Sequence, residues 1–309
     1  MQRTSAIVLG IAAIVAVAVI AFLLMSRQPG EPTASATPEP TDSAEPTASA
    51  TLNADLLERR WTVLYVGTDA NARREADGEP VNADALMLVS LSADQSELTL
   101  VSLPRDTVDV PLPDGGVYPR KINGLYAEGG TDGLVGAMET LYGVAVDAHV
   151  VMDMDDFAAL VTAVDGVEVS PPSPLADPKV DLDLQAGPQE LDPAQTLGYV
   201  RTRVDKDYGR MGRQQEVLLQ LVERLVDPET DIDLAALIEV LDSLETDVPL
   251  DQLPTLIELA RRASDAEVQT LVIEPPLITF EGDRSDGRGY ILEADVEAIR
   301  AEVQELIGE

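Results

Sequence analysis

Basic residues gather in one short segment of a chain that is otherwise strongly acidic. The chain has 309 residues and a formal net charge of −35, yet the stretch from Arg201 to Arg213 (RTRVDKDYGRMGR) holds five basic residues against two acidic ones. Arg210 and Gln214, four residues apart, would share one face of a helix. A guanidinium presents a planar fork of donors that matches phosphate oxygens. The segment therefore predicts a phosphate or polyphosphate site, with a solvated helix face carrying local salt bridges as the alternative.

A second group of polar residues lies at the ends of predicted strands. Asp69 follows the first apolar run, Asp84 precedes the second, and Arg105 follows the third. If the first two strands are neighbours, Asp69 and Asp84 approach each other, and two carboxylates together with substrate phosphates are a common Mg²⁺ site. The alternative is that each Asp is a turn residue. Lys121 precedes an Asn–Gly turn and adds another cation.

Composition excludes several other kinds of site. The chain has no cysteine and one histidine, His149, which removes disulfides, thiolate nucleophiles and multi-His metal centres. His149 lies in an apolar strand pattern and no Gly-x-Ser-x-Gly motif is present, so we expect a structural role for it rather than a Ser–His–Asp triad. The excess of acidic residues argues against nucleic-acid binding, which depends on Lys and Arg.

Apolar runs alternate with helical periodicity from Trp61 onward, and these elements must position the polar residues. Strands are predicted at residues 61–66, 85–91, 97–103, 148–152, 167–169 and 268–273. Helices are predicted at residues 132–142, 155–164, 193–199, 208–226, 234–244, 251–263 and 293–307. Strands mixed with helices throughout predict a single α/β layered domain.

The N-terminal part differs from the rest of the chain. Residues 6–25 carry no charge, and at about 1.5 Å per residue they reach across the roughly 30 Å hydrocarbon core of a bilayer. A signal peptide is the alternative, although its apolar region is usually about 7–15 residues long. Beyond Arg27 the next residues lack Lys and Arg, which favours a cytoplasmic N-terminus. We expect a cytoplasmic end at 1–5, a transmembrane helix at 6–25, an acidic Pro/Ala/Ser/Thr-rich linker at 26–54 and an extracytoplasmic catalytic domain at 55–309, in a single-pass protein of the cell membrane.

Taken in chain order, the polar motifs resemble the LytR-CpsA-Psr family of bacterial cell-wall proteins. The motifs are GTD at 67–69, DALML at 84–88, SLPRDT at 102–107, KINGLYAEGG at 121–130, and YVRTR with GRMGRQQ within 199–215. The resemblance implies an α/β/α layered domain with a mixed central sheet and a hydrophobic pocket for a polyprenyl chain. It also implies a phosphotransferase that moves an anionic or capsular glycopolymer, such as teichoic acid, from a polyprenyl-pyrophosphate carrier onto peptidoglycan.

The same resemblance assigns roles to individual residues. It implies a metal site for Mg²⁺ (or Mn²⁺) at Asp69 and Asp84. The implied pyrophosphate contacts are Arg105, Lys121, Arg201, Arg203, Arg210, Arg213 and Gln214. The implied catalytic residues are Arg105, Asp84, Arg203 and Asp106, although Asp106 could instead bond within its loop to Thr107. Candidates for the lipid pocket are Leu134, Met138, Leu141, Phe157, Leu160, Val161 and Leu218, which sequence does not separate from core residues.

One departure from the family pattern stands beside the second acidic position. Many members have Arg-Ser-Asp-Thr where this chain has Asn82-Ala83-Asp84-Ala85, and Arg73 or Arg74 is a candidate to replace the missing arginine. Both carboxylates are kept, so the change concerns metal binding more than the class of activity. Two other functions stay open: a non-catalytic protein that binds polyprenyl-phosphate lipids and regulates envelope assembly, and a lipid pyrophosphatase with water as the acceptor.

Overall fold

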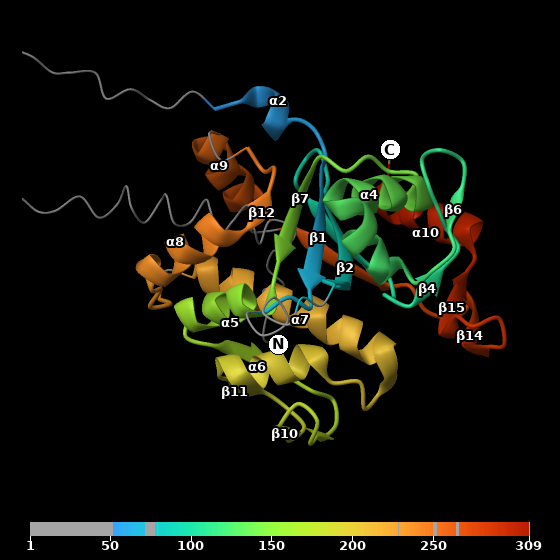
Figure 1. The fold of residues 1–309 in the computed structure, drawn as a ribbon. Coiled ribbons are helices and arrows are strands. Elements are labelled where there is room, and N and C mark those ends of the chain that lie inside the picture. The colour runs from blue at the N-terminus through green and yellow to red at the C-terminus, as the bar shows by residue number, and fades with distance from the viewer. Residues whose placement is uncertain are drawn as a thin grey trace, which may run out of the picture.

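A computed structural model describes residues 52–71, 78, 80–227, 229–249, 252–263 and 266–308 (Figure 1). The predicted membrane span at 6–25, most of the linker at 26–54, and Arg73 and Arg74 lie outside the described residues. Within the part of the chain that is described, no helix combines the length and the hydropathy that crossing a membrane requires.

A six-stranded mixed sheet forms the centre of the domain. Its spatial order is β12-β7-β1-β2-β3-β13, with bounds β1 Trp61–Thr68, β2 Ala83–Leu91, β3 Glu97–Ser102, β7 Ala148–Met152, β12 Glu245–Thr246 and β13 Glu267–Val272. β1 pairs antiparallel with β2 and parallel with β7. β3 pairs antiparallel with β2 and parallel with β13. The carboxyl ends of β1, β3, β7 and β13 therefore share one edge of the sheet with the start of β2.

Helices cover both faces of this sheet and make three layers (Figure 1). Alternate residues of β1 show why: Val63 belongs to one apolar core and Leu64 to the other, because successive strand side chains point to opposite faces. The helices on the Val63 face are α5 Met154–Ala163, α6 Pro193–Arg201, α7 Lys206–Val226, α8 Leu234–Ser243 and α9 Leu253–Ala263. Those on the Leu64 face are α4 Leu125–Tyr142 and α10 Val296–Ile307. The predicted α/β layering and mixed central sheet are confirmed.

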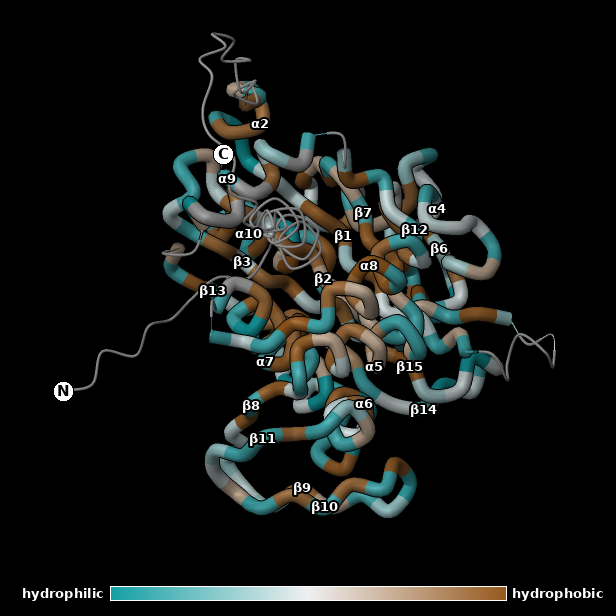
Figure 2. Tube along the Cα trace, turned by 90° about the vertical axis from the view of Figure 1, so that its left-hand side faces the viewer, coloured by the Kyte–Doolittle hydropathy of each residue, from teal (hydrophilic) through white to brown (hydrophobic). Residues whose placement is uncertain are grey.

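Shorter elements lie outside the six-stranded sheet, and the tube in Figure 2 shows β8 to β11 grouped together beside α6. The remaining helices are α2 Ala54–Leu57 and the 3₁₀ turn η1 Ile122–Gly124. The remaining strands are β4 Thr107–Val108, β5 Val110–Pro111, β6 Val117–Tyr118, β8 Val167–Val169, β9 Leu175–Asp177, β10 Leu182–Leu184, β11 Gln189–Leu191, β14 Ile278–Arg284 and β15 Gly289–Ala294. β15 pairs antiparallel with β14 and parallel with β4.

Two helices begin well away from the predicted residue, and the other predicted boundaries shift by at most two residues. A further helical segment that begins at Leu125 precedes the helix predicted at residues 132–142, and a kink at Gly130, whose φ is +63°, separates the two segments of α4. The last helix begins at Val296 and not at residue 293. Asp295 caps it by accepting a hydrogen bond from the amide of Ala298 at 3.0 Å, and the preceding residues form β15. The β14–β15 hairpin is an addition that the sequence pattern did not predict.

Candidate functional site

The functional candidates converge at the sheet edge where β1, β3 and β7 end and β2 begins. Asp69 directly follows β1, Asp84 is the second residue of β2, and Arg105 lies just beyond β3. The predicted neighbour relation of the first two strands is confirmed by the antiparallel register that pairs Val66 with Leu86. Strand connectivity therefore places Asp69, Asp84 and Arg105 together, as the sequence suggested.

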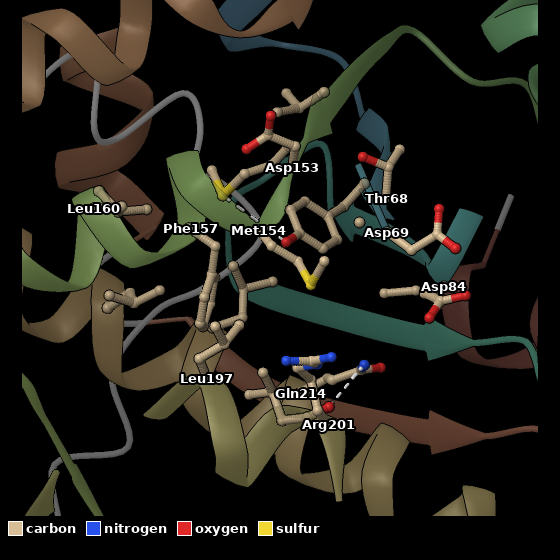
Figure 3. Close-up of a pocket in the computed structure, with 18 of the residues that line it drawn as sticks. Thr68, Asp69, Asp84, Asp153, Met154, Phe157, Leu160, Leu197, Arg201 and Gln214 are labelled. Atoms are coloured by element: carbon tan, nitrogen blue, oxygen red, sulfur yellow. Dashed lines mark hydrogen bonds between the residues drawn. The ribbon is translucent and has the colours of Figure 1, made fainter. Parts of the chain in front are cut away.

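A cavity of about 560 Å³ opens at this edge on the face covered by α5 to α8. One end is apolar, and Figure 3 shows Phe157, Leu160 and Leu197 there, with the Asp69 and Asp84 carboxylates at the other end. Further apolar lining comes from Leu218, Leu237 and Leu241. The polar end is lined by Thr68, Asp69, Asn71, Asp84, Arg105, Asp153, Arg201, Arg203, Arg210 and Gln214. A single cavity thus combines a long apolar wall with a charged mouth.

The arginines at the mouth are held close to one another by shared carboxylates. Asp207 accepts a hydrogen bond from Nε of Arg210 at 2.9 Å and forms an ion pair with Arg203 at 3.2 Å. Arg210 is 3% exposed and also donates to the carbonyl oxygen of Asp84 at 2.8 Å. Arg105 forms an ion pair with the Asp84 side chain. The first turns of α7 are thereby tied to the start of β2.

The guanidinium groups of Arg105, Arg203 and Arg210 lie close enough together at the mouth to repel one another. Burial lowers the pKa of Arg203, and the nearby cations Arg210 and Arg105 lower it further. Burial disfavours the charged form of Asp207, but the attraction and hydrogen bond of Arg210 and the charge of Arg203 outweigh it and hold the pKa of Asp207 below its usual range. A bound anion would relieve the repulsion among the three guanidinium groups. Arg201, exposed at the end of α6, lines the same mouth.

Most predicted site residues line this cavity, and three do not. Those that do are Asp69, Asp84, Arg105, Arg201, Arg203, Arg210 and Gln214. Arg213 is 7% exposed and donates to the carbonyl oxygens of Tyr199 at 2.9 Å and Thr202 at 2.5 Å and to the Asp205 carboxylate at 2.6 Å, which joins α6 to α7. Asp106 and Lys121 form an ion pair at 2.9 Å outside the lining. Asp106 therefore pairs with Lys121, whereas Thr107 donates its hydroxyl to the carbonyl of Pro104 at 2.7 Å.

The structure also separates pocket residues from core residues. Phe157, Leu160 and Leu218 line the cavity as proposed, whereas Val161 is fully buried in the core behind it. The candidates on α4 are wrong for this cavity, because they belong to the apolar core on the opposite face of the sheet: Leu134, Met138 and Leu141. His149 is also outside the lining and its Nδ1 lies 3.1 Å from the Asp247 carboxylate.

Two further polar residues lie near the metal candidates: sequence reasoning missed Asp153, and it noted Asn82 only as part of the departure from the family pattern. Asp153 follows β7 as Asp69 follows β1, and the rule that neighbouring parallel strands end at one edge could have found it. Asn82 holds Asp69 from two sides: its backbone amide donates to Oδ1 at 2.8 Å and its side-chain amide donates to Oδ2 at 3.1 Å. The amide of Asp69 donates back to the carbonyl of Asn82 at 3.0 Å. The residue that departs from the family pattern is thus bound directly to the first acidic candidate.

Comparison with known proteins identifies relatives by sequence. The chain is 38% identical over 149 residues to the probable cell wall biosynthesis protein LcpB of Corynebacterium glutamicum, which covers 48% of this chain and 35% of LcpB. It is 26% identical over 229 residues to TagV of Bacillus subtilis, named a polyisoprenyl-teichoic acid–peptidoglycan teichoic acid transferase, covering 71% of this chain and 58% of TagV. The chain therefore matches roughly a third to three fifths of the length of these two relatives.

Solved structures and a family model agree with these relatives. The crystal structure of Bacillus subtilis TagV superposes with a TM-score of 0.63 at 23% identity, covering 81% of this chain and 98% of that one. The structure of YwtF (TagT) with bound octaprenyl pyrophosphate lipid has a TM-score of 0.58 at 24% identity, covering 82% of this chain and 93% of that one. These likenesses establish the fold. The sequence model of the LytR_cpsA_psr family matches residues 25–305, and the chain therefore belongs to the LytR_cpsA_psr family.

Proposed function

We propose that this protein transfers an anionic or capsular glycopolymer from a polyprenyl-pyrophosphate carrier onto peptidoglycan. The observation that carries the proposal is the single cavity in which an apolar wall leads to a mouth with three converging arginines. A polyprenyl pyrophosphate has the same division, with a long apolar chain attached to two phosphates. The relatives support the assignment, since TagV is named a teichoic acid transferase and the structure of YwtF (TagT) holds octaprenyl pyrophosphate.

The two ends of the cavity would hold the two parts of the carrier. Burial of prenyl carbon against Phe157, Leu197 and Leu218 supplies about 0.8 kcal/mol for each CH₂ group. At the mouth, Arg105, Arg203 and Arg210 are placed to hold the diphosphate oxygens, and charge-assisted bonds from guanidinium to phosphate are the strong type. The lipid chain would therefore set the depth of the substrate, and the arginines would position its phosphorus atoms.

The transfer step needs positioning and charge neutralisation above all. A hydroxyl oxygen of the acceptor forms a bond to the phosphorus that carries the glycopolymer, and the bond from that phosphorus to the polyprenyl phosphate oxygen breaks. The hydroxyl proton passes to a carboxylate or to water, and polyprenyl phosphate leaves with the electron pair. The arginines at the mouth stabilise the charge that develops on the leaving phosphate. Asp84 lines the cavity and is ion-paired with Arg105, and we propose it as that carboxylate.

The two carboxylates at the mouth fit a magnesium ion that shares its coordination with substrate. Among the described residues, no group of three or more His, Cys, Asp or Glu side chains is arranged to hold a metal ion. Mg²⁺ is commonly bound through one or two carboxylates plus substrate phosphates and water, which matches Asp69 and Asp84. A bound Mg²⁺ (or Mn²⁺) would neutralise charge on the diphosphate oxygens. We also propose that residues 6–25 anchor the protein in the cell membrane with the catalytic domain outside, which would keep the cavity within reach of membrane-borne carriers.

A transfer assay on the full chain in detergent tests this function against its alternatives. The protein is incubated with a polyprenyl-pyrophosphoryl oligosaccharide, Mg²⁺ and peptidoglycan fragments, and covalent products are measured by mass spectrometry. We expect transfer that is lost in Arg105→Ala. Lipid binding without any product would favour the non-catalytic binding protein, and release of sugar phosphate without transfer would favour the pyrophosphatase. Arg262→Ala is the control, because Arg262 pairs with Glu258 on α9 and does not line the cavity.

A further inference from the structure

A second cavity lies on the face of the sheet opposite the first cavity. It has a volume of about 380 Å³ and is lined by Tyr118, Arg120, Lys121, Asn123, Glu128 and Arg288, together with the backbone at Gly124 and Gly287. We call it the polar cleft. Tyr118 and its neighbour Ile122 belong to the core beneath α4 and α10, whereas the apolar wall of the first cavity belongs to the other core. In Figure 1, β6 and β14–β15 accordingly lie across the sheet from α5 and α8.

The polar cleft is joined to the catalytic mouth through two contacts. The amide of Asn123 donates to the carbonyl oxygen of Arg105 at 3.2 Å. Lys121 forms its ion pair with Asp106, the residue next to Arg105. Arg105 thus has its side chain in the first cavity and its backbone against the cleft. The two cavities meet at the loop that follows β3.

An exposed aromatic ring lies on the β14–β15 hairpin, two residues after Arg288 of the polar cleft. Tyr290, in β15, is 42% exposed, and its hydroxyl is held by a hydrogen bond to Glu281. Burial of its hydroxyl and the bond to Glu281 raise the pKa of Tyr290 to about 12, and the charges of Asp106 and Asp207 add to this. Asp106 is the partner of Lys121 in the cleft, and Asp207 is the partner of the cavity arginines. Glu281, which accepts the hydrogen bond of the Tyr290 hydroxyl, also accepts one from Tyr208 near the start of α7, so Tyr290 is an anchored ring linked to the helix that carries the cavity arginines.

The chemistry of the lining indicates a ligand rich in hydroxyl groups. Each cation of the polar cleft already has a carboxylate partner: Arg120 pairs with Glu128, Lys121 with Asp106, and Arg288 with Asp109 and Asp286. A hydroxyl group both donates and accepts hydrogen bonds, so it can bond to these ion-paired groups as they stand. The lining has no Leu, Ile, Val or Phe that would suit a lipid. The C–H face of a sugar ring packs well against an exposed aromatic ring such as Tyr290.

The geometry of the proposed reaction indicates which substrate would supply a saccharide to the polar cleft. In phosphoryl transfer the attacking and leaving oxygens lie roughly in line on opposite sides of the phosphorus. The leaving polyprenyl phosphate would lie toward the apolar wall under α5 and α8, so the attacking hydroxyl would approach from the opposite side of the phosphorus. The polar cleft adjoins the backbone of Arg105 through Asn123 and would supply the acceptor from that side. We infer that the polar cleft and Tyr290 bind the saccharide acceptor. This inference rests on the proposed function.

Kinetics that vary the two substrates separately test the inference on the full chain in detergent. The variants are Tyr290→Ala and Arg288→Ala, with Tyr290→Phe keeping the ring while losing the bond to Glu281. Arg224→Ala is the matched control, because its side chain is 27% exposed and paired with Glu190, while that of Arg288 is 26% exposed and paired with Asp109. We expect KM for a soluble peptidoglycan oligosaccharide to rise about tenfold in both alanine variants, as for a binding residue worth over 1 kcal/mol. KM for the lipid donor should stay unchanged. Tyr290→Phe should raise the acceptor KM less than Tyr290→Ala does, because it keeps the ring, and Arg224→Ala should behave as the wild type.

Direct binding of the same oligosaccharide, measured by calorimetry without donor, separates this inference from the proposed function. Binding that weakens in Tyr290→Ala while the wild type makes no product would refute the transferase and support the saccharide site. Transfer with an unchanged acceptor KM in both alanine variants would overturn the saccharide site and leave the transferase standing. A rise in donor KM alone would also overturn it, because the cleft would then hold the donor polymer. Thermal unfolding of each variant confirms that the comparison is made on folded protein.

Discussion

Replacing Arg213 with methionine tests whether this arginine organises the phosphate site without contacting the ligand. Arg213 lies outside the cavity lining and its guanidinium donates to the carbonyl oxygens of Tyr199 and Thr202 and to Asp205. These bonds hold the end of α6 and the following turn against α7. Arg201 and Arg203, which do line the cavity, lie on the segment that is held. We therefore expect a loss of stability to dominate the effect of Arg213→Met.

The size of that loss follows from the groups left without a donor. Each buried acceptor that loses its partner costs about 1–3 kcal/mol, so the two carbonyls together cost about 2–6 kcal/mol. The pair with Asp205 adds little, because that carboxylate is 46% exposed and screened by solvent. In a domain of this size 1 kcal/mol shifts Tm by about 2–4 °C, so a mid-range loss of 4 kcal/mol lowers Tm by about 12 °C.

Circular dichroism melting and binding of octaprenyl pyrophosphate well below Tm provide the assay. Arg201→Ala is the comparison, since Arg201 is exposed at the mouth. We expect it to lose about tenfold in lipid affinity, the equivalent of 1.4 kcal/mol, with Tm almost unchanged. Arg213→Met should show the reverse: a large fall in Tm and a smaller loss of affinity. An unchanged Tm in Arg213→Met, together with a loss of affinity exceeding that of Arg201→Ala, would refute the reasoning. Arg213 would then contact the ligand directly.

Three further predictions concern the metal, the acid stability and the lipid. Asn82→Ala removes the side-chain donor to Asp69, so we expect Mn²⁺ affinity of the full chain, measured by electron paramagnetic resonance, to fall about 10–100-fold; an unchanged affinity would place the metal elsewhere. The pKa of Asp207 is lower in the folded protein than in the unfolded chain, where it is about 3.9. The charge of Asp207 therefore stabilises the fold at pH values above about 3.9, and this stabilisation is lost as the pH falls through the folded-state pKa. Asp207→Asn should therefore flatten the acid decline of the unfolding free energy in urea titrations, and an unaltered decline would contradict this. Leu197→Trp fills part of the apolar end of the cavity and should shift lipid binding toward shorter prenyl chains in competition assays. Equal weakening for all chain lengths would argue against a prenyl chain that lies along Leu197.

Relations within one helix or between adjacent strands were predictable from the sequence. Arg210 and Gln214 were expected on one helical face and both line the cavity, because a spacing of four residues brings side chains to the same side of a helix. Asp69 and Asp84 were expected to approach each other if the first two strands paired, and they do share the cavity mouth. Such relations depend on backbone periodicity and on the pairing of adjacent strands, which the residue pattern specifies.

Relations between distant elements were not predictable in the same way. Arg213 belongs to the same basic cluster as Arg210, yet the packing of α7 against α6 turns it toward backbone carbonyls and away from the cavity. The β14–β15 hairpin was missed because its exposed, glycine-containing strands have few buried apolar residues, and one of them also pairs with β4 across 185 residues of sequence, counted from Thr107 to Leu292. The polar cleft depends on this hairpin and was therefore not foreseen.

The sequence by itself determined the family resemblance, the α/β layering and the residue types that phosphate chemistry needs, since these are written in motifs and in local periodicity. The tertiary structure decided which apolar residues form a cavity and which form a core. Leu141 and Leu160 are alike in character, yet Leu141 on α4 packs into the core on one face of the sheet and Leu160 on α5 lines the cavity on the other. The physical reason is that a hydrophobic side chain is driven to leave water regardless of its partner, whereas its partner depends on which face of the sheet each helix covers.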